Sequence, residues 1–192
     1  MKTALGAVTL VASLFVTASA ALAETKPAAR KPAPAKPAAT SPATPAGSPL
    51  LLVEAKDWRA FTAATAKGKI CFALSKPQKM EPPSLNHGDV FFFISTRPGE
   101  NVRNEPSLQV GYPMKEGSKA AADIDGKKFA MFTKADGAWL EQDGDLPKFL
   151  DAMKKGSKMS ITATSGRGNP TSYAFSLSGL STALEATAKE CK

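Results

Sequence analysis

The sequence predicts an all-β fold, mainly antiparallel, in the form of a β-sandwich or partly open barrel with two short helices. Several short segments alternate apolar and polar residues with a period of two, which is typical of half-buried strands. Turn signals such as Asp125-Gly126 separate these segments, and only two segments show the apolar spacing of a helix. The chain has 192 residues, which is enough for one such domain and a further segment.

The predicted strands follow from this alternation. Between Ile70 and Lys76, large apolar residues alternate with smaller ones, so the two faces of the strand differ. The run Val90 to Ile94 is apolar at every position and is predicted to be a central strand covered on both faces. Three prolines predict a loop from Lys76 to Gly88. We expect strands at residues 50–53, 58–65, 70–76, 90–94, 107–111, 121–124, 127–133, 138–141, 158–164 and 172–177.

Two helices are expected. From Leu146, apolar residues recur at i, i+3, i+4 and i+7, with Asp145 as the predicted N-cap and Gly156 just after the end. A second helix begins at about Leu180 and places Cys191 on its inward face.

The first 23 residues have the order of a secretory signal peptide. Lys2 supplies the positive charge, an apolar run extends from Ala4 to Val16, and Ala21-Leu22-Ala23 offers the small residues of a cleavage site. The run is too short for a membrane-spanning helix, which needs about 20 apolar residues. Cleavage after Ala20 is the alternative. We therefore expect a protein that is periplasmic, outer-envelope-associated or secreted, without a membrane span.

Residues 24–49 differ in composition from the C-terminal three quarters of the chain. They are almost entirely Ala, Pro, Lys, Ser and Thr and contain seven of the fifteen prolines, so they lack the apolar surface that would offset the entropy of ordering. The predicted organisation is a signal peptide at 1–23, a disordered linker at 24–49 and a β domain at 50–192. The formal net charge of +8 comes from scattered lysines and arginines, so nucleic acid is not an expected partner.

The two cysteines, Cys71 and Cys191, favour a disulfide, because an even count in an exported protein is typical of paired thiols. Two buried free thiols are the alternative.

No residue pattern indicates a catalytic, cofactor or metal site. His87 is the single histidine and is predicted to lie in a solvated loop, and a zinc site normally needs three or four ligands. The acidic pairs Asp123/Asp125 and Asp143/Asp145 leave a hydrolase with separated carboxylates as an alternative, although Asp125 and Asp145 already have predicted turn and cap roles.

The two tryptophans, Trp58 and Trp139, are the candidate surface or ligand contacts, with core positions as the alternative.

Short motifs also occur in a fixed order along residues 50–192. They are Asp57-Trp58, Cys71, Gly111-Tyr112-Pro113, Ile124-Asp125-Gly126, Gly137, Met153-Lys154-Lys155-Gly156, Ser176-Leu177-Ser178-Gly179-Leu180 and Ala183-Leu184. In this order the chain resembles the bacterial invasion-associated locus B family, and the run from Ser176 to Leu180 is the most specific element. The resemblance implies an envelope-associated or secreted β protein without established enzyme activity, linked in some pathogens to host-cell entry.

The chain departs from the family pattern at one place. Many members carry a second cysteine pair, in regions that here read Phe132-Thr133 and Gly137-Ala138-Trp139. The resemblance therefore implies a single bridge, Cys71–Cys191, with Trp139 filling the volume of the missing one. Three functions remain open at this point: a non-enzymatic binder of a protein or glycan, a cell-wall or glycan hydrolase, and a structural envelope protein.

Overall fold

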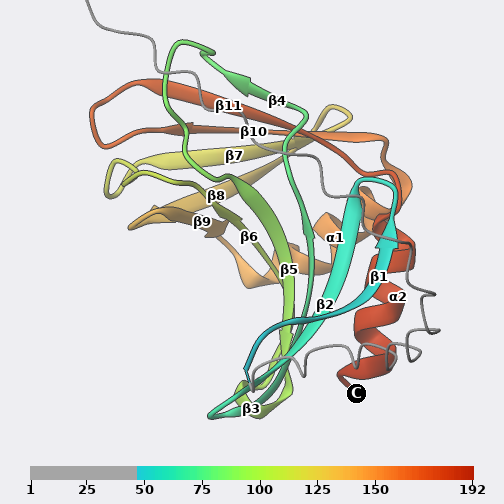
Figure 1. Ribbon diagram of the computed structural model, residues 1–192. Coiled ribbons are helices and arrows are strands. Elements are labelled where there is room, and N and C mark those ends of the chain that lie inside the picture. Colours follow the sequence, from blue (N-terminus) through green and yellow to red (C-terminus); the bar gives the residue numbers. More distant parts are fainter. Residues whose placement is uncertain (1–46) are drawn as a thin grey trace, which may run out of the picture. The chain divides into compact units, whose positions relative to one another are not determined.

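The computed structural model describes residues 47–192 (Figure 1). The predicted signal peptide and most of the predicted linker lie outside this range. The strands are β1 (Leu50–Ala55), β2 (Trp58–Thr65), β3 (Gly68–Ser75), β4 (Lys79–Glu81), β5 (Phe91–Arg97), β6 (Val102–Gln109), β7 (Lys119–Ile124), β8 (Lys127–Lys134), β9 (Gly137–Leu140), β10 (Lys158–Thr164) and β11 (Pro170–Ser176). The helices are α1 (Leu146–Lys155) and α2 (Leu180–Glu190), with single 3-10 turns at Pro98–Glu100 and Asp143–Asp145.

All eleven strands form one antiparallel sheet in the order β1-β2-β3-β5-β6-β9-β8-β7-β10-β11-β4. Figure 1 shows the sheet curling strongly, so that β10 and β11 run across the direction of β2 and β3. The two edge strands, β1 and β4, do not pair with each other, and the barrel stays open. The predicted all-β class with two short helices is confirmed.

The core lies on the inner side of the curl. Phe149 of α1 packs against Phe92 of β5 and Phe129 of β8, with ring centroids 6.3 and 5.0 Å apart. Helix α2 packs on β1, β2 and β3. The helices thus fill the space that the sheet leaves open. Within residues 47–192, no helix combines the length and apolarity needed to cross a bilayer.

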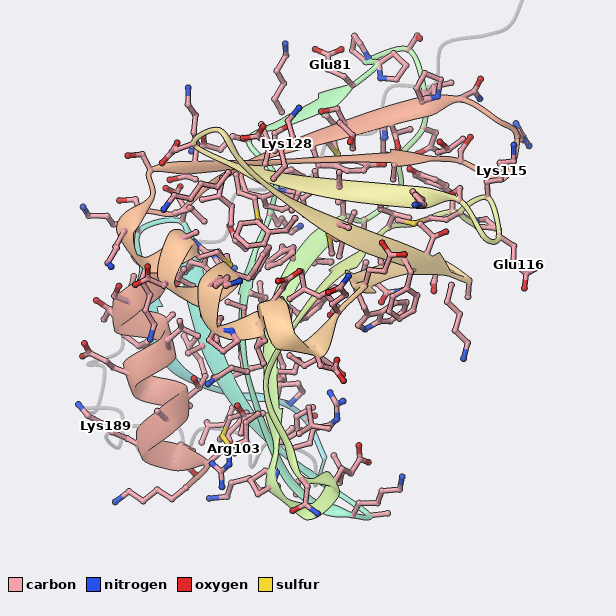
Figure 2. The ribbon with its side chains drawn as sticks, turned by 180° about the vertical axis from the view of Figure 1, so that it is seen from behind. Glu81, Arg103, Lys115, Glu116, Lys128 and Lys189 are labelled. Atoms are coloured by element: carbon pink, nitrogen blue, oxygen red, sulfur yellow. A yellow bond between two sulfur atoms is a disulfide. The ribbon has the colours of Figure 1, made fainter. Side chains whose placement is uncertain are left out.

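Cys71 and Cys191 are joined, with their Cα atoms 5.9 Å apart. Cys71 points to the inner face of β3, where α2 docks. The alternation of the strand predicts this, because Cys71 lies on the face opposite to that of Ile70 and Phe72. Figure 2 shows the sulfur atoms beside Arg103, whose guanidinium donates a hydrogen bond to the carbonyl oxygen of Cys191 at 3.3 Å.

Two local predictions are wrong, and a third is confirmed in position only. Strand β5 is not covered on both faces along its length, because Phe91 and Phe93 on the outer face remain partly exposed. The predicted loop at 76–88 contains the short edge strand β4, which pairs with β11. Asp145 stands at the N-cap position of α1 but makes no capping hydrogen bond, since its backbone is already helical in the preceding 3-10 turn.

Candidate functional site

The two tryptophans occupy opposite environments. Trp58 is fully buried, and its indole N–H donates a hydrogen bond to the carbonyl oxygen of Ser176 at 2.9 Å. A buried indole whose N–H donates to the backbone is a core residue. Trp58 is therefore not a surface contact. Trp139 lies on the outer face of β9 and is partly exposed, so it remains a candidate.

An aromatic surface covers part of the outer face of the sheet. Strands β2, β3 and β5 contribute four phenylalanines, and their rings contact one another with centroid distances of 5.4 to 5.9 Å. Strands β8 and β9 add two further aromatic residues that pair across the same face. We call these six residues the outer aromatic band: Phe61, Phe72, Phe91, Phe93, Phe132 and Trp139.

The register shows why these side chains gather. Phe61 lies opposite Phe72, Phe93 lies opposite Ser107, and Ser107 lies opposite Trp139. Residues paired across antiparallel strands point to the same face, so the phenylalanines of β2, β3 and β5 form one cluster. Phe132 and Trp139 form a second cluster on the same face, and Ser107 of β6 lies between the two. Neither helix covers this face, because both pack on the inner side.

At one end of the band, Phe132 and Trp139 form a flat pair. Their ring centroids are 5.8 Å apart and their planes differ by 26°. Gly137 lies beneath the indole, and a β-carbon at Gly137 would overlap the six-membered ring of Trp139. The missing side chain therefore lets the indole lie against the sheet. Phe132 is 42% exposed, the highest value for any aromatic among residues 47–192. We call this pair the aromatic platform.

At the other end, a cation lies over the band. The ammonium nitrogen of Lys76 is 4.9 Å from the ring centroid of Phe91, and it is 3.9 Å from a carboxylate oxygen of Asp89. Ring faces are electron-rich, so the ammonium group is attracted to Phe91.

His87 is buried, which contradicts the prediction of a solvated loop residue. It is 5% exposed. Its Nε2 lies 2.9 Å from the carbonyl oxygen of Pro82, and a carbonyl can only accept, so Nε2 carries a proton. In the neutral ring, Nδ1 then accepts a hydrogen bond from the hydroxyl of Tyr173 at 3.1 Å. The Tyr173 hydroxyl also contacts that of Tyr112, which in turn lies 2.9 Å from the hydroxyl of Thr171.

Two glycines bring this cluster together. Gly88 and Gly111 pass so closely that a β-carbon on either would overlap the backbone of the other, and the amide of Gly111 donates to the carbonyl of His87 at 3.1 Å. The contact sets Tyr112 beside His87. Burial, and then the hydrogen bond with Tyr112, raises the pKa of Tyr173 well above its ordinary value. A pocket of about 560 Å³ borders the cluster.

The pair Asp123/Asp125 has a structural role, whereas Asp143 and Asp145 lie in the 3-10 turn before α1. A carboxylate oxygen of Asp123 accepts a hydrogen bond from the amide of Gly126 at 2.7 Å, and one of Asp125 accepts from the amide of Ser157 at 2.6 Å. Asp125 and Gly126 both have positive φ, as a type I′ turn requires, which agrees with the turn predicted there. Among residues 47–192, no three His, Cys, Asp or Glu side chains gather in a way that would hold a metal ion.

The motif from Ser176 to Leu180 also has a structural role. Gly179 precedes α2 with φ of +94°, and a β-carbon there would overlap the carbonyl of Ala55. The motif around Gly179 therefore fixes α2 against the β1–β2 turn, where Leu177 and Leu180 enter the core.

The chain matches the family described as Invasion associated locus B (IalB) protein over residues 58–188. It belongs to this family. The crystal structure of invasion associated protein B from Bartonella henselae is similar in fold, with a TM-score of 0.50 and 14% identity, over 74% of this chain and 99% of that chain. Among curated proteins, none matches.

The IalB motifs thus map largely to turns and helix contacts, whereas the outer aromatic band was missed by the sequence analysis. Its signal was present. Phe61 and Phe72 alternate with small inner residues, and the same alternation holds within the apolar run around Phe92. This run predicts a strand covered on both faces because its outer residues are as apolar as its inner ones. Apolar composition alone does not distinguish a covered face from an exposed one.

Proposed function

We infer that this IalB-family protein is an exported, non-enzymatic protein of the envelope or the medium, and that it binds a protein or glycan partner through the outer aromatic band. The family connects the chain with invasion-associated proteins. The apolar run at 4–16 followed by Ala21-Leu22-Ala23 supports export.

One observation carries the binding proposal: six aromatic side chains lie on a sheet face that neither α1 nor α2 covers. Exposed apolar surface is costly in water, and contiguous patches on soluble proteins commonly mark interaction sites. Aromatic residues are also enriched in the cores of protein interfaces, where they supply large contact area with few rotatable bonds. The band therefore has the composition of a binding surface.

The same geometry favours binding over hydrolysis. Carboxylate oxygens of Asp123 and Asp125 accept hydrogen bonds from the backbone amides of Gly126 and Ser157. Both ring nitrogens of His87 also form hydrogen bonds. A general acid or base must reach the substrate with a free lone pair or proton. These groups serve the fold instead.

Export is tested by N-terminal sequencing of the protein from envelope and medium fractions. We expect the mature chain to begin at Glu24, or at Ala21 if the alternative site is used. An intact Met1 in the cytosol would contradict export.

Binding is tested by photo-crosslinking of the purified domain to envelope extract and to host-cell surfaces. We expect the double variant Phe61→Ser/Phe93→Ser to lose the products that the wild type forms. Met80→Ser is the matched control, because Met80 is 38% exposed and lies on the edge strand β4 rather than in the band. Equal products from a folded band variant and the wild type would overturn the proposal.

A further inference from the structure

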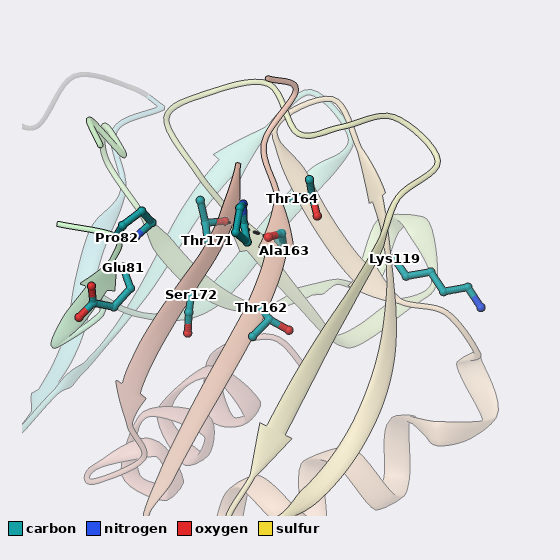
Figure 3. Close-up of a pocket in the computed structure, with 9 residues that line it drawn as sticks. Glu81, Pro82, Lys119, Thr162, Ala163, Thr164, Thr171 and Ser172 are labelled. Atoms are coloured by element: carbon teal, nitrogen blue, oxygen red, sulfur yellow. Dashed lines mark hydrogen bonds between the residues drawn. The ribbon is translucent and has the colours of Figure 1, made fainter. Parts of the chain in front are cut away.

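The aromatic platform continues into a polar surface on the same face of the sheet. Phe132 of β8 pairs with Trp139 of β9 on one side and with Lys119 of β7 on the other. Lys119 also lines a shallow groove of about 480 Å³ over β10 and β11 (Figure 3). One lysine therefore belongs both to the row of the platform and to the wall of the groove.

The groove is lined by small hydroxyl side chains. Thr162 and Thr164 of β10 and Ser172 of β11 contribute them, and Figure 3 shows Thr162 and Ser172 side by side between Glu81 and Lys119. Thr162 and Ser172 are partners across the two strands. A hydroxyl can donate one hydrogen bond and accept two, so such a row suits a ligand that itself carries hydroxyl groups.

Two lysines lie on the groove side of the platform, whereas Glu105 and Asp143 line the hollow on its other side, with Glu105 paired to Arg97. Lys134 lies two residues from Phe132 on β8 and pairs with Gly137 beneath the platform. Neither Lys119 nor Lys134 forms an ion pair with any residue that the structure describes. The carboxylate of Glu81, at the far wall of the groove, is held by Lys79 at 2.7 Å. The surface between platform and groove therefore favours anionic groups.

We propose that the platform and the groove together bind a linear glycan that carries acidic groups. This rests on the proposed function and names the partner class for one end of the outer aromatic band. Aromatic faces attract the C–H bonds on the flat side of a sugar ring, hydroxyl side chains pair with sugar hydroxyls, and lysines neutralise carboxylate or phosphate groups.

The dimensions suit a chain rather than a single sugar. From β9 to β11 the sheet crosses four strand spacings, which is roughly 19 Å at about 4.8 Å per spacing. The groove is open and shallow, so it takes an extended ligand lying along the surface. The glycan would run across the strands, with one sugar on Trp139 and later sugars over Thr162 and Ser172.

The experiment is calorimetric titration of the purified chain with three probes: hyaluronan octasaccharide as a linear acidic glycan, chitohexaose as a neutral one, and poly-glutamate as an acidic polymer without sugars. We expect hyaluronan to bind most tightly, chitohexaose more weakly and poly-glutamate least. Fluorescence gives a second readout, because Trp58 is buried and a ligand-induced change reports on Trp139.

Each part of the surface has a variant. Trp139→Ala should weaken hyaluronan binding at least tenfold, with partial recovery in Trp139→Phe. Thr162→Val, which keeps the shape and removes the hydroxyl, should weaken binding several-fold. Lys119→Gln should weaken hyaluronan binding and leave chitohexaose binding unchanged. Lys189→Gln on α2 is the charge-matched control, since Lys189 is exposed and lies away from this face (Figure 2).

Two results would overturn the inference. The first is the absence of hyaluronan binding by the folded wild type. The second is poly-glutamate binding as tight as that of hyaluronan and unaffected by Trp139→Ala, which would indicate an acidic-protein site. If photo-crosslinked products remain sensitive to Phe61→Ser/Phe93→Ser in either case, the proposed function stands and the glycan inference alone fails.

Discussion

Both faces of β3 and β5 carry apolar residues, but the two faces differ in how deeply these residues are buried. On the inner face, Phe92 is fully buried between Trp58, Phe149 and Phe175. On the outer face, the rings of Phe72 and Phe93 pack against other phenylalanines of the same sheet and stay partly exposed. The inner aromatics stabilise the fold by leaving water, whereas the outer ones keep part of their surface exposed. Folding therefore buries the aromatic residues of one face more completely than those of the other.

The largest effect expected from this difference is on stability. Phe92→Ala should lower the free energy of unfolding by about 3–5 kcal/mol, because it removes a fully buried ring and leaves a cavity. Phe72→Ala should lower it by only about 0.2–1 kcal/mol, the usual value of a cross-strand side-chain pair. Urea denaturation followed by circular dichroism measures both. Equal losses would mean that the outer face is as enclosed as the inner one.

The disulfide sharpens the comparison, because it links the inner face of β3 to α2. Replacing both cysteines with alanine should lower the free energy of unfolding by about 2–5 kcal/mol, the usual cost of removing a native bridge. The mass of the unreduced protein provides the control, since the wild type should be two hydrogens lighter than the dithiol form. An unchanged unfolding free energy would show that the bridge contributes nothing to stability.

Tyr173 extends the comparison to the inner side of β11, where it is fully buried. Its folded-state pKa is raised above the ordinary value of 10.0, so its contribution to stability is full below about pH 10 and is lost as the pH rises further. In Tyr112→Phe, Tyr173 is the single tyrosine left. We expect its tyrosinate absorbance to appear only together with alkaline unfolding. Reversible ionisation near pH 10 in a native protein would contradict burial as the cause.

The smallest effect is expected from the predicted linker, which belongs to neither face. Deleting residues 26–48 should leave the melting temperature nearly unchanged, because its composition offers little apolar surface for burial. Differential scanning calorimetry of the full and shortened chains tests this. A decrease of several degrees would indicate that the segment packs on the domain.

Local signals predicted much of the fold. The alternation from Ile70, the turn at Asp125-Gly126 and the apolar stripe of α1 gave the correct elements at nearly the correct bounds. Strand β6 was predicted to begin at Ser107, but it begins at Val102. Its first residues are polar and include Pro106, so only their pairing with β5 reveals them as strand. Strand β4 is three residues long and forms solely through its contact with β11.

The candidate site was less accessible to sequence analysis, because it depends on which residues meet across strands. Trp139 was identified by residue type alone. The surface around Trp139 depends on three residues: Phe132 opposite it, Gly137 beneath it and Lys119 on β7. The register of the strands brings these residues together. The sequence placed Trp58 and Trp139 in one class, although burial separates them. His87 was misjudged for a similar reason, since Tyr112 and Tyr173 bury it from distant parts of the chain.

The cysteine pair has a consequence for biogenesis. Cys71 and Cys191 are separated by 120 residues, and the chain contains no other cysteine. If the chain is threaded across a membrane from its N-terminus, Cys71 emerges long before Cys191. Cys71 then remains a free thiol until Cys191 follows. Only one intramolecular pairing exists, so an oxidase alone suffices and no isomerase is needed to correct it. During this interval, the Cys71 thiols of two nascent chains can form an intermolecular disulfide. The risk of this side reaction depends on the local concentration of nascent chains and not on a choice among cysteines within one chain.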